Sequence, residues 1–199
     1  MPKINAESVT EHVEQQRAAV RDAATRLFVA RSYSEVSLAD VAAEVGLARN
    51  SLYRYVPDKS HLLVEWYRDA VPRVTSVWKP LLEADGPPAE RIIAWADAFL
   101  SWARTPEHDL ITQLTEILPS LPVEVRAEIA TLHESMFGTV AEVLTEAGIP
   151  TTQVPGVVRI LSHMVQGAAR AATEGELGDE VRDRLDAAIR TLVVPAPRR

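Results

Sequence analysis

The chain contains no cysteine, which excludes disulfides, thiolate metal sites and cysteine nucleophiles. No stretch approaches the roughly 18 to 20 apolar residues that a membrane-spanning helix needs. The N-terminus has no apolar segment of the kind found in signal peptides, so we expect a cytoplasmic protein that does not contact the membrane. The sequence also lacks a glycine-rich phosphate loop, a nucleophile elbow and a metal-binding motif. We therefore expect neither an enzyme nor a bound cofactor or metal.

Basic residues are in the minority, and the formal net charge is −7. This balance at first argues against nucleic acid as a partner. However, residues 1–68 carry equal numbers of basic and acidic side chains, and residues 69–199 hold the whole acidic excess. A protein that binds nucleic acid needs to be basic only on the face that docks. The net negative charge therefore does not exclude nucleic-acid binding by the N-terminal third of the chain.

Alternation of apolar and polar residues, which is typical of half-buried strands, is missing as well. Apolar residues instead recur at spacings of three and four, as they do on one face of a helix. The pattern predicts an all-α protein with about nine helices, divided into a small N-terminal three-helix head and a larger helical body.

Prolines and glycines mark where the predicted helices end. In the helix that follows Asp58, Pro72 is expected to cause a kink or an end, and Pro80 is expected to be a firmer stop, because proline has no N–H for the helical hydrogen bond. The segment Pro122–Ala147 is predicted to be one long helix, closed by Gly148.

The most informative stretch is Ser37–Lys59. Ser37 is a suitable N-cap for a short amphipathic helix that reaches Val45, and Gly46 should stop that helix. A second short helix is predicted over Ala48–Tyr55, and Pro57 prevents its continuation. Two short helices joined by a glycine-containing turn form a helix-turn-helix, whose second helix can lie in the DNA major groove.

Ser37 to Leu63 resembles the DNA-binding signature of TetR-type (TetR/AcrR) transcriptional regulators. The match covers about 27 residues in a strict spacing. The residues that carry it are Ser37, Val41-Ala42, Gly46-Leu47, Leu52-Tyr53-Arg54-Tyr55, Lys59 and Leu62-Leu63. Three positions depart from the usual pattern: Ala48 replaces Ser or Thr, Asn50 replaces Gly, and Val56 replaces Phe. Because alanine has no side-chain acceptor, we expect the second helix to lack its usual cap.

The resemblance implies a homodimeric regulator, most often a repressor, that binds a palindromic operator and is released by a small-molecule effector. It assigns DNA binding to residues 11–57, and ligand binding and dimerisation to residues 58–195. The residues implied to face base edges or phosphates are Arg49, Asn50 and Ser51. Those implied to contact the DNA backbone are Ser37, Tyr53, Tyr55 and Lys59, with Arg54 between the tyrosines.

Aromatic residues and histidines in the body are candidates for the effector site. Trp95, Phe99 and Trp102 follow one helical face, and alone this spacing fits core packing as well as a pocket, whereas the resemblance favours a pocket. His133 and Phe137 share a face and could equally be ordinary packing residues. The candidate ligand-binding residues are Trp66, Trp95, Phe99, Trp102, His133, Phe137, His163 and Met164. A metal site between the two histidines has no spaced ligand cluster to support it.

Small residues in Gly167-Ala168-Ala169 permit close helix approach. This fits a four-helix dimer interface built from the last two helices of each subunit, although close packing inside a monomer explains it too. An alternative function, a helical small-molecule-binding protein or enzyme with a structural head, stays open at this point.

Overall fold

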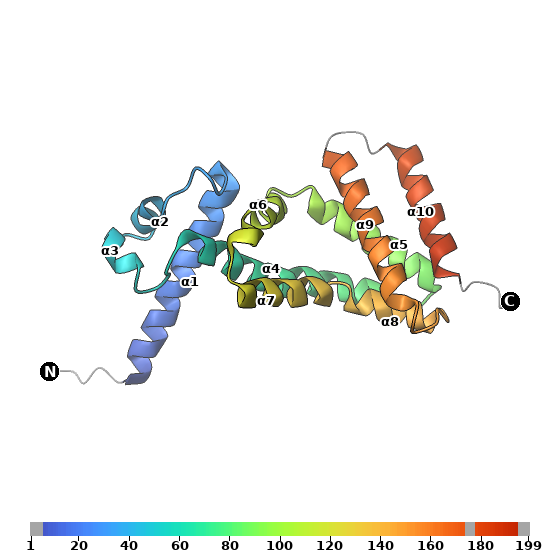
Figure 1. Ribbon diagram of the computed structural model, residues 1–199, viewed down its shortest axis with the longest axis horizontal. Coiled ribbons are helices and arrows are strands. Elements are labelled where there is room, and N and C mark those ends of the chain that lie inside the picture. The colour runs from blue at the N-terminus through green and yellow to red at the C-terminus, as the bar shows by residue number, and fades with distance from the viewer. Residues whose placement is uncertain (1–5, 174–177, 195–199) are drawn as a thin grey trace. The chain divides into compact units, whose positions relative to one another are not determined.

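The computed structural model describes residues 6–173 and 178–194, and every regular element in these ranges is helical, which confirms the all-α class (Figure 1). The helices are α1 (Ala6–Arg31), α2 (Leu38–Glu44), α3 (Arg49–Leu52), α4 (Lys59–Leu82), α5 (Pro88–Ala103), α6 (Asp109–Ile117), the 3-10 turn η1 (Leu118–Ser120), α7 (Val123–Ser135), α8 (Gly138–Glu146), α9 (Val154–Thr173) and α10 (Asp179–Val193). None of them, within the described residues, is long and apolar enough to span a bilayer. Position 195, the predicted end of the second domain, lies outside these ranges.

The chain forms two compact units. Within the described residues, the first comprises residues 6–70 and 109–129, and the second comprises residues 71–108, 130–173 and 178–194. Helices α4 and α7 each begin in the first unit and end in the second. The predicted DNA-binding segment, residues 11–57, lies entirely in the first unit.

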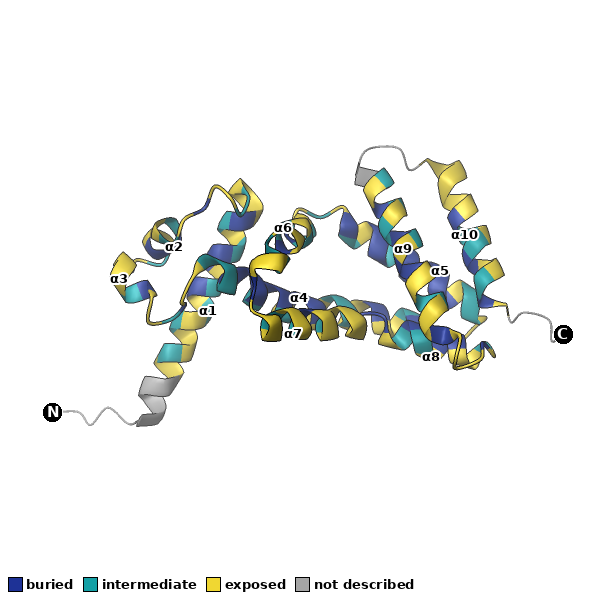
Figure 2. Ribbon diagram, viewed as in Figure 1, coloured by how far each residue is buried: buried dark blue, intermediate teal, exposed yellow. Residues whose placement is uncertain are grey.

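The core of the first unit is formed by α1, α2, α3 and α6. Helix α1 contacts both α2 and α6, and α2 contacts α3. The apolar stripe of α1 is fully buried at Val20, Ala24 and Phe28, while its other face is exposed (Figure 2). Phe28 meets the ring of Tyr33 edge-on, with ring centroids 5.2 Å apart. The three-helix head expected from the sequence is thus present.

The second unit is organised around α5. This helix contacts α8, α9 and α10, and Ile92, Trp95 and Leu100 are almost completely enclosed. The only charged residue that is buried along it is Arg91, whose guanidinium forms an ion pair with Glu146. An apolar surface on nearly all sides is typical of a helix surrounded by neighbours.

The firm stop expected at Pro80 of α4 is absent, which is a correction to the sequence prediction. The helix continues through Pro72 and through Pro80 and ends at Leu82, so neither proline stops it. Proline removes one hydrogen bond of the helical ladder without removing the others. The hydroxyl of Thr75 donates to the carbonyls of Val71 and Pro72, at 2.9 and 3.1 Å, which gives this turn additional hydrogen bonds.

The segment Pro122–Ala147 is two helices and not one, which is a correction to the sequence prediction. Helix α7 ends at Ser135 and α8 begins at Gly138, so the described residues hold ten α-helices where the pattern predicts about nine. Between them, Met136 and Phe137 are both buried, at 5% exposure each. The following Gly138 disfavours helix by about 1 kcal/mol relative to alanine, so a continuous helix is less stable at this position.

Candidate nucleic-acid interface and effector cavity

The first helix of the predicted motif begins with a complete capping box. The hydroxyl of Ser37 accepts the backbone N–H of Asp40 at 3.2 Å, and the Asp40 carboxylate accepts the backbone N–H of Ser37 at 2.8 Å. The Ser37 hydroxyl also donates to this carboxylate at 2.6 Å. These bonds to Ser37, with a smaller effect of Arg31, lower the pKa of Asp40. A box closed by residues three apart is a local consequence of the sequence.

The turn after α2 is closed by Gly46. Its φ of 69° lies in the left-handed region, which glycine enters without steric cost. The N–H of Leu47 donates to the carbonyl of Ala42 at 2.8 Å, and that of Gly46 donates to Ala43 at 3.2 Å. This pair of bonds is a Schellman motif, which ends the helix and aims the chain toward α3.

The second helix is short and lacks a side-chain cap at Ala48, as its sequence predicts. Although α3 itself ends at Leu52, the carbonyl of Leu52 accepts the N–H groups of Tyr55 and Val56, at 2.8 and 3.1 Å. The helical turn therefore continues past its formal end. The buried side chains of Leu52 and Val56 fix this segment against the core, at 0% and 2% exposure.

The opposite face of the same segment is polar. Arg49, Asn50, Tyr53 and Arg54 are exposed, and Tyr53 has 48% of its surface free. Ser51 and Tyr55 are half-buried. The guanidinium groups of Arg49 and Arg54 form no ion pair or hydrogen bond within the described part of the chain. The guanidinium groups of Arg49 and Arg54, which have no partner among the described residues, lie on the same polar face as the exposed amide of Asn50. Such a face suits the anionic, hydrogen-bonding surface of a DNA groove.

Lys59 is held by the protein's own backbone. Its ammonium donates to the carbonyls of Tyr33 and Val36, at 2.7 and 2.9 Å, and lies 4.1 Å from the centroid of the Tyr33 ring. Desolvation in this position lowers the pKa of Lys59. The loop that leads into α2 is thereby tied to the start of α4. The backbone N–H of Tyr33 also donates to the side chain of Gln113 on α6.

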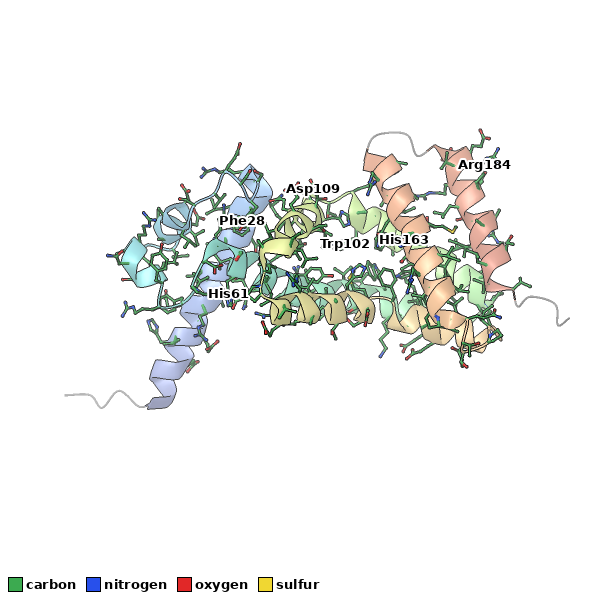
Figure 3. The ribbon with its side chains drawn as sticks, in the orientation of Figure 1. Phe28, His61, Trp102, Asp109, His163 and Arg184 are labelled. Atoms are coloured by element: carbon green, nitrogen blue, oxygen red, sulfur yellow. The ribbon has the colours of Figure 1, made fainter. Side chains whose placement is uncertain are left out.

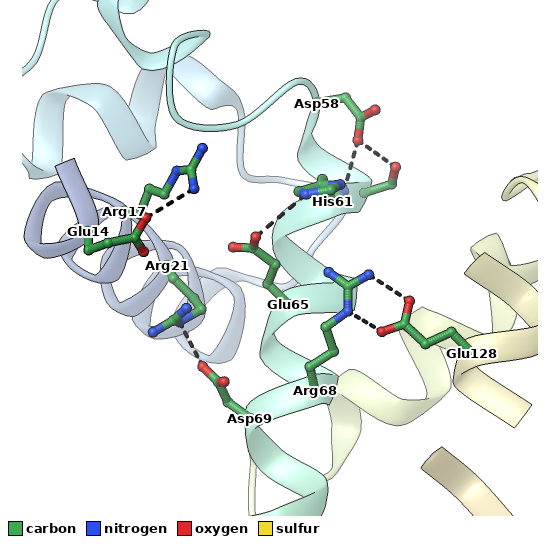
Figure 4. Close-up of polar contacts among 10 residues, drawn as sticks. Glu14, Arg17, Arg21, Asp58, His61, Glu65, Arg68, Asp69 and Glu128 are labelled. Atoms are coloured by element: carbon green, nitrogen blue, oxygen red, sulfur yellow. Dashed lines mark hydrogen bonds and ion pairs between the residues drawn. The ribbon is translucent and has the colours of Figure 1, made fainter. Parts of the chain in front are cut away.

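Ion pairs attach α4 to its neighbours in the first unit (Figure 4). Arg21 of α1 pairs with Asp69 at 2.7 Å, and Arg68 forms a two-bond contact with Glu128 of α7. The bonds with Arg68 lower the pKa of Glu128. These contacts involve partly exposed side chains, so they fix orientation more than they add stability.

Most of the aromatic candidates in the second unit form a packed cluster. Trp78, which the sequence analysis did not single out, lies with its ring centroid 6.2 Å from Trp95, 5.5 Å from Phe99 and 5.6 Å from Trp102. Trp95 and Phe99 are buried and line neither cavity described below. Trp66 is a buried residue of the first unit, beside Tyr67. Packing of these rings on one another, edge-on for Trp78 with Trp95 and Trp102 and tilted for Trp78 with Phe99, explains their helical spacing.

Three other candidates do meet at a cavity. His133, Phe137 and His163, the last labelled on α9 in Figure 3, line a space of about 510 Å³. The cavity lies between α9 and the α7–α8 break, and Met164 is not part of its wall. Its full lining is His133, Glu134, Phe137, Gly138, Ala141, Val154, Pro155, Val158, Arg159, Ser162, His163 and Gln166. Desolvation lowers the pKa of His133, opposed by Glu134 and assisted by the charge of His163.

A second, shallower hollow of about 600 Å³ lies between α4 and α5. Trp102, labelled in Figure 3, forms part of its wall, and the ion pair between Arg73 and Glu107 lies at its edge. Within the described residues, no group of three or more His, Asp or Glu side chains gathers to form a metal site.

Comparison with known proteins agrees with this geometry. The family model described as "Bacterial regulatory proteins, tetR family" matches residues 20–66. No curated protein matches the chain in sequence. A Saccharomonospora viridis protein described as a transcriptional regulator, solved in complex with choline, superposes with a TM-score of 0.70 at 20% identity, covering 89% of this chain and 96% of its own. A tetR-family regulatory protein from Rhodococcus RHA1 superposes with a TM-score of 0.68 at 18% identity, covering 91% and 98%. The TetR-family regulator PfmR of Thermus thermophilus gives 0.60 at 19% identity, covering 90% and 99%.

The first unit carries a helix-turn-helix and the second unit is an all-helical body, which is the architecture of TetR-family regulators. Residues 20–66 match the model of the tetR family of bacterial regulatory proteins, and the described chain has the fold of TetR-family regulators. The resemblance inferred from Ser37–Leu63 is confirmed.

Proposed function

We propose that the protein is a cytoplasmic TetR-type repressor that binds a palindromic operator as a homodimer and releases it when a small molecule binds the helical body. The observation that carries this proposal is the second helix of the motif. Its buried side chains anchor it, and Arg49, Asn50 and Arg54 stay exposed without partners of their own among the described residues. Such a helix can enter a major groove without first breaking internal contacts.

The roles of the exposed residues follow from their chemistry. Asn50 can form two hydrogen bonds with an adenine edge, and Arg49 or Arg54 can do so with guanine. The hydroxyls of Ser51, Tyr53 and Tyr55 suit phosphate oxygens, which fix the register of the protein on the duplex, whereas the Ser37 hydroxyl already donates to the Asp40 carboxylate. We assign Lys59 to the loop that leads into α2, because its ammonium already donates to two carbonyls there.

Dimerisation is proposed through α9 and α10. Ile160 on α9 and Val181 on α10 are exposed, at 49% and 43%, and the nearby Gly167 lets helices approach closely. A two-fold dimer that reads two half-sites needs its recognition helices about one DNA turn apart, roughly 34–36 Å. Light scattering on the purified protein tests this: a monomer at micromolar concentration would refute it. Ala168→Glu should otherwise shift the dimer toward monomer.

An effector acts by binding one conformation of the body better than another, which changes the separation of the recognition helices. The cavity beside α9 is of a size that small molecules occupy. The choline bound to the Saccharomonospora viridis protein, which shares the fold, supports a small-molecule effector here.

The decisive experiment is selection of bound duplexes from a random pool, followed by fluorescence anisotropy at several salt concentrations. We expect an inverted repeat and an affinity that falls steeply with salt. Arg54→Ala should weaken DNA binding. Arg104→Ala is the control and should not weaken it, because this arginine is also exposed but lies in the second unit. Absence of any enriched sequence would favour the alternative, a helical small-molecule-binding protein with a structural head.

A further inference from the structure

The cavity beside α9 combines an apolar floor with an uneven distribution of charge. Phe137, at 5% exposure, and Val154, at 7%, supply buried apolar surface, and Ala141 and Val158 extend it. The charged or titratable groups at its wall are His133, Glu134, Arg159 and His163. A volume of about 510 Å³ lies within the range that binds small organic molecules, roughly 300–1,000 Å³.

Arg159 is the distinctive group. Most arginines described in the second unit are in ion pairs: these are Arg73, Arg91, Arg182, Arg184 and Arg190. Arg104, Arg159 and Arg170 have no such partner within the described residues, and among these three only Arg159 lines the cavity. Its guanidinium is therefore free to bind a ligand at the cavity.

The neighbouring groups favour negative charge in the ligand. His133 and His163 come from two different helices, α7 and α9, and are close enough for the charge of His163 to lower the pKa of His133. A neutral imidazole still offers one N–H donor. The first turn of α9, at Val154 and Pro155, brings the positive end of a 20-residue helix to the same wall. Glu134 is the one acidic group in the lining and opposes these contributions.

We propose that this cavity binds a small organic carboxylate with a compact apolar or aromatic body. The carboxylate accepts two hydrogen bonds from the planar guanidinium of Arg159, a pairing that arginine makes better than lysine. The apolar body lies on Phe137 and the aliphatic residues of α8 and α9. This inference rests on the proposed function, because the carboxylate would be the effector that releases DNA. Binding of the carboxylate can nevertheless be measured without DNA.

The test uses the full chain and calorimetric titration with two matched pairs, benzoate against benzamide and octanoate against octanamide. We expect at least one acid to bind, with its uncharged amide weaker by about tenfold or more, because the amide cannot form the ionic pair with Arg159. Arg159→Gln should remove the difference between acid and amide. Arg170→Gln, which changes an unpaired arginine of the same helix outside the cavity, should keep it.

The outcomes separate the inference from the proposed function. No binding by either acid into the millimolar range, or equal binding of acid and amide, overturns the inference, even if the protein binds an operator. Preference for the acid that is lost in Arg159→Gln supports it, even if no operator is found. Light scattering on Arg159→Gln gives a further check, because a changed oligomeric state together with lost binding would assign the cavity to a subunit contact and overturn the ligand site.

Discussion

Replacing Lys59 with methionine tests how the helix-turn-helix is held in place. The ammonium donates to the carbonyls of Tyr33 and Val36, and Val36 directly precedes the capping residue Ser37. Methionine keeps most of the side-chain volume but cannot donate a hydrogen bond. The loop into α2 then loses its tie to α4, while the bond from Tyr33 to Gln113 remains.

The expected loss can be worked from these contacts. A hydrogen bond to a charged group contributes about 1.5–3 kcal/mol, and a partly exposed cation over an aromatic ring about 0.5–1 kcal/mol. Because Lys59 is half-buried and the contacts are not additive, we expect the variant to lose about 2–3 kcal/mol of unfolding free energy. In a chain of this size that lowers the melting temperature by about 4–12 °C.

Two measurements separate this role from a phosphate contact. Thermal unfolding should show the loss, and the affinity for operator DNA should fall with little change in its dependence on salt. A lost phosphate contact would instead reduce the slope of log K against log salt by about 0.9 per contact. Lys79→Met is the matched control, since this lysine of α4 is 61% exposed and pairs only with Glu83 among the described residues. Unchanged stability together with a reduced slope would refute the reasoning.

The remaining predictions concern the same motif and the dimer. Asn50→Ala should alter the preferred base at one position of each half-site, as measured by repeating the selection; equal losses on all sequences would show that Asn50 is not a reader. Ser37→Ala should cost about 1 kcal/mol in urea unfolding through loss of the cap. The pKa of Asp40 is lowered in the folded protein. The stability that its carboxylate contributes is therefore complete above its ordinary pKa and is lost as pH falls through the folded-state pKa. Asp40→Asn should make unfolding free energy depend less on pH in the acid range. Gly46→Ala should cost about 1–2 kcal/mol of unfolding free energy, because φ is +69°. No neighbouring atom crowds the added methyl group, so the backbone conformation alone causes this loss. Gly46→Asn should lose less, because asparagine adopts the left-handed conformation more readily. Ile160→Asp should weaken the dimer in sedimentation experiments without changing the melting of dilute monomer, since half of this side chain is exposed.

Local features of the fold were predictable from the sequence. The capping box joins Ser37 to Asp40 and the Schellman motif joins Ala42 to Leu47, so both depend on residues at most five positions apart. The exception was the break between α7 and α8. Met136 and Phe137 continue the apolar pattern, and their burial, together with the low helix propensity of Gly138, favours interrupting α7 there.

The effect of proline in α4 could not be predicted from local rules. Pro72 and Pro80 each remove one N–H, but whether a helix continues depends on the contacts that hold the residues on either side. Burial of Val71, Trp78 and Leu82 stabilises the helix through both positions. Tertiary packing thus outweighs the local penalty.

The helical class, the motif at Ser37–Lys59 and its exposed polar face can be predicted from the sequence, because each depends on the periodicity and caps of neighbouring residues. Tertiary packing sets what Lys59 contacts, since its partners Tyr33 and Val36 are 26 and 23 residues away. It likewise decided that Trp95 and Phe99 are core while Arg159 faces a cavity. The physical reason is that a side chain's spacing fixes its face on a helix, but the neighbouring helices decide whether that face meets a packed core, an open cavity or solvent.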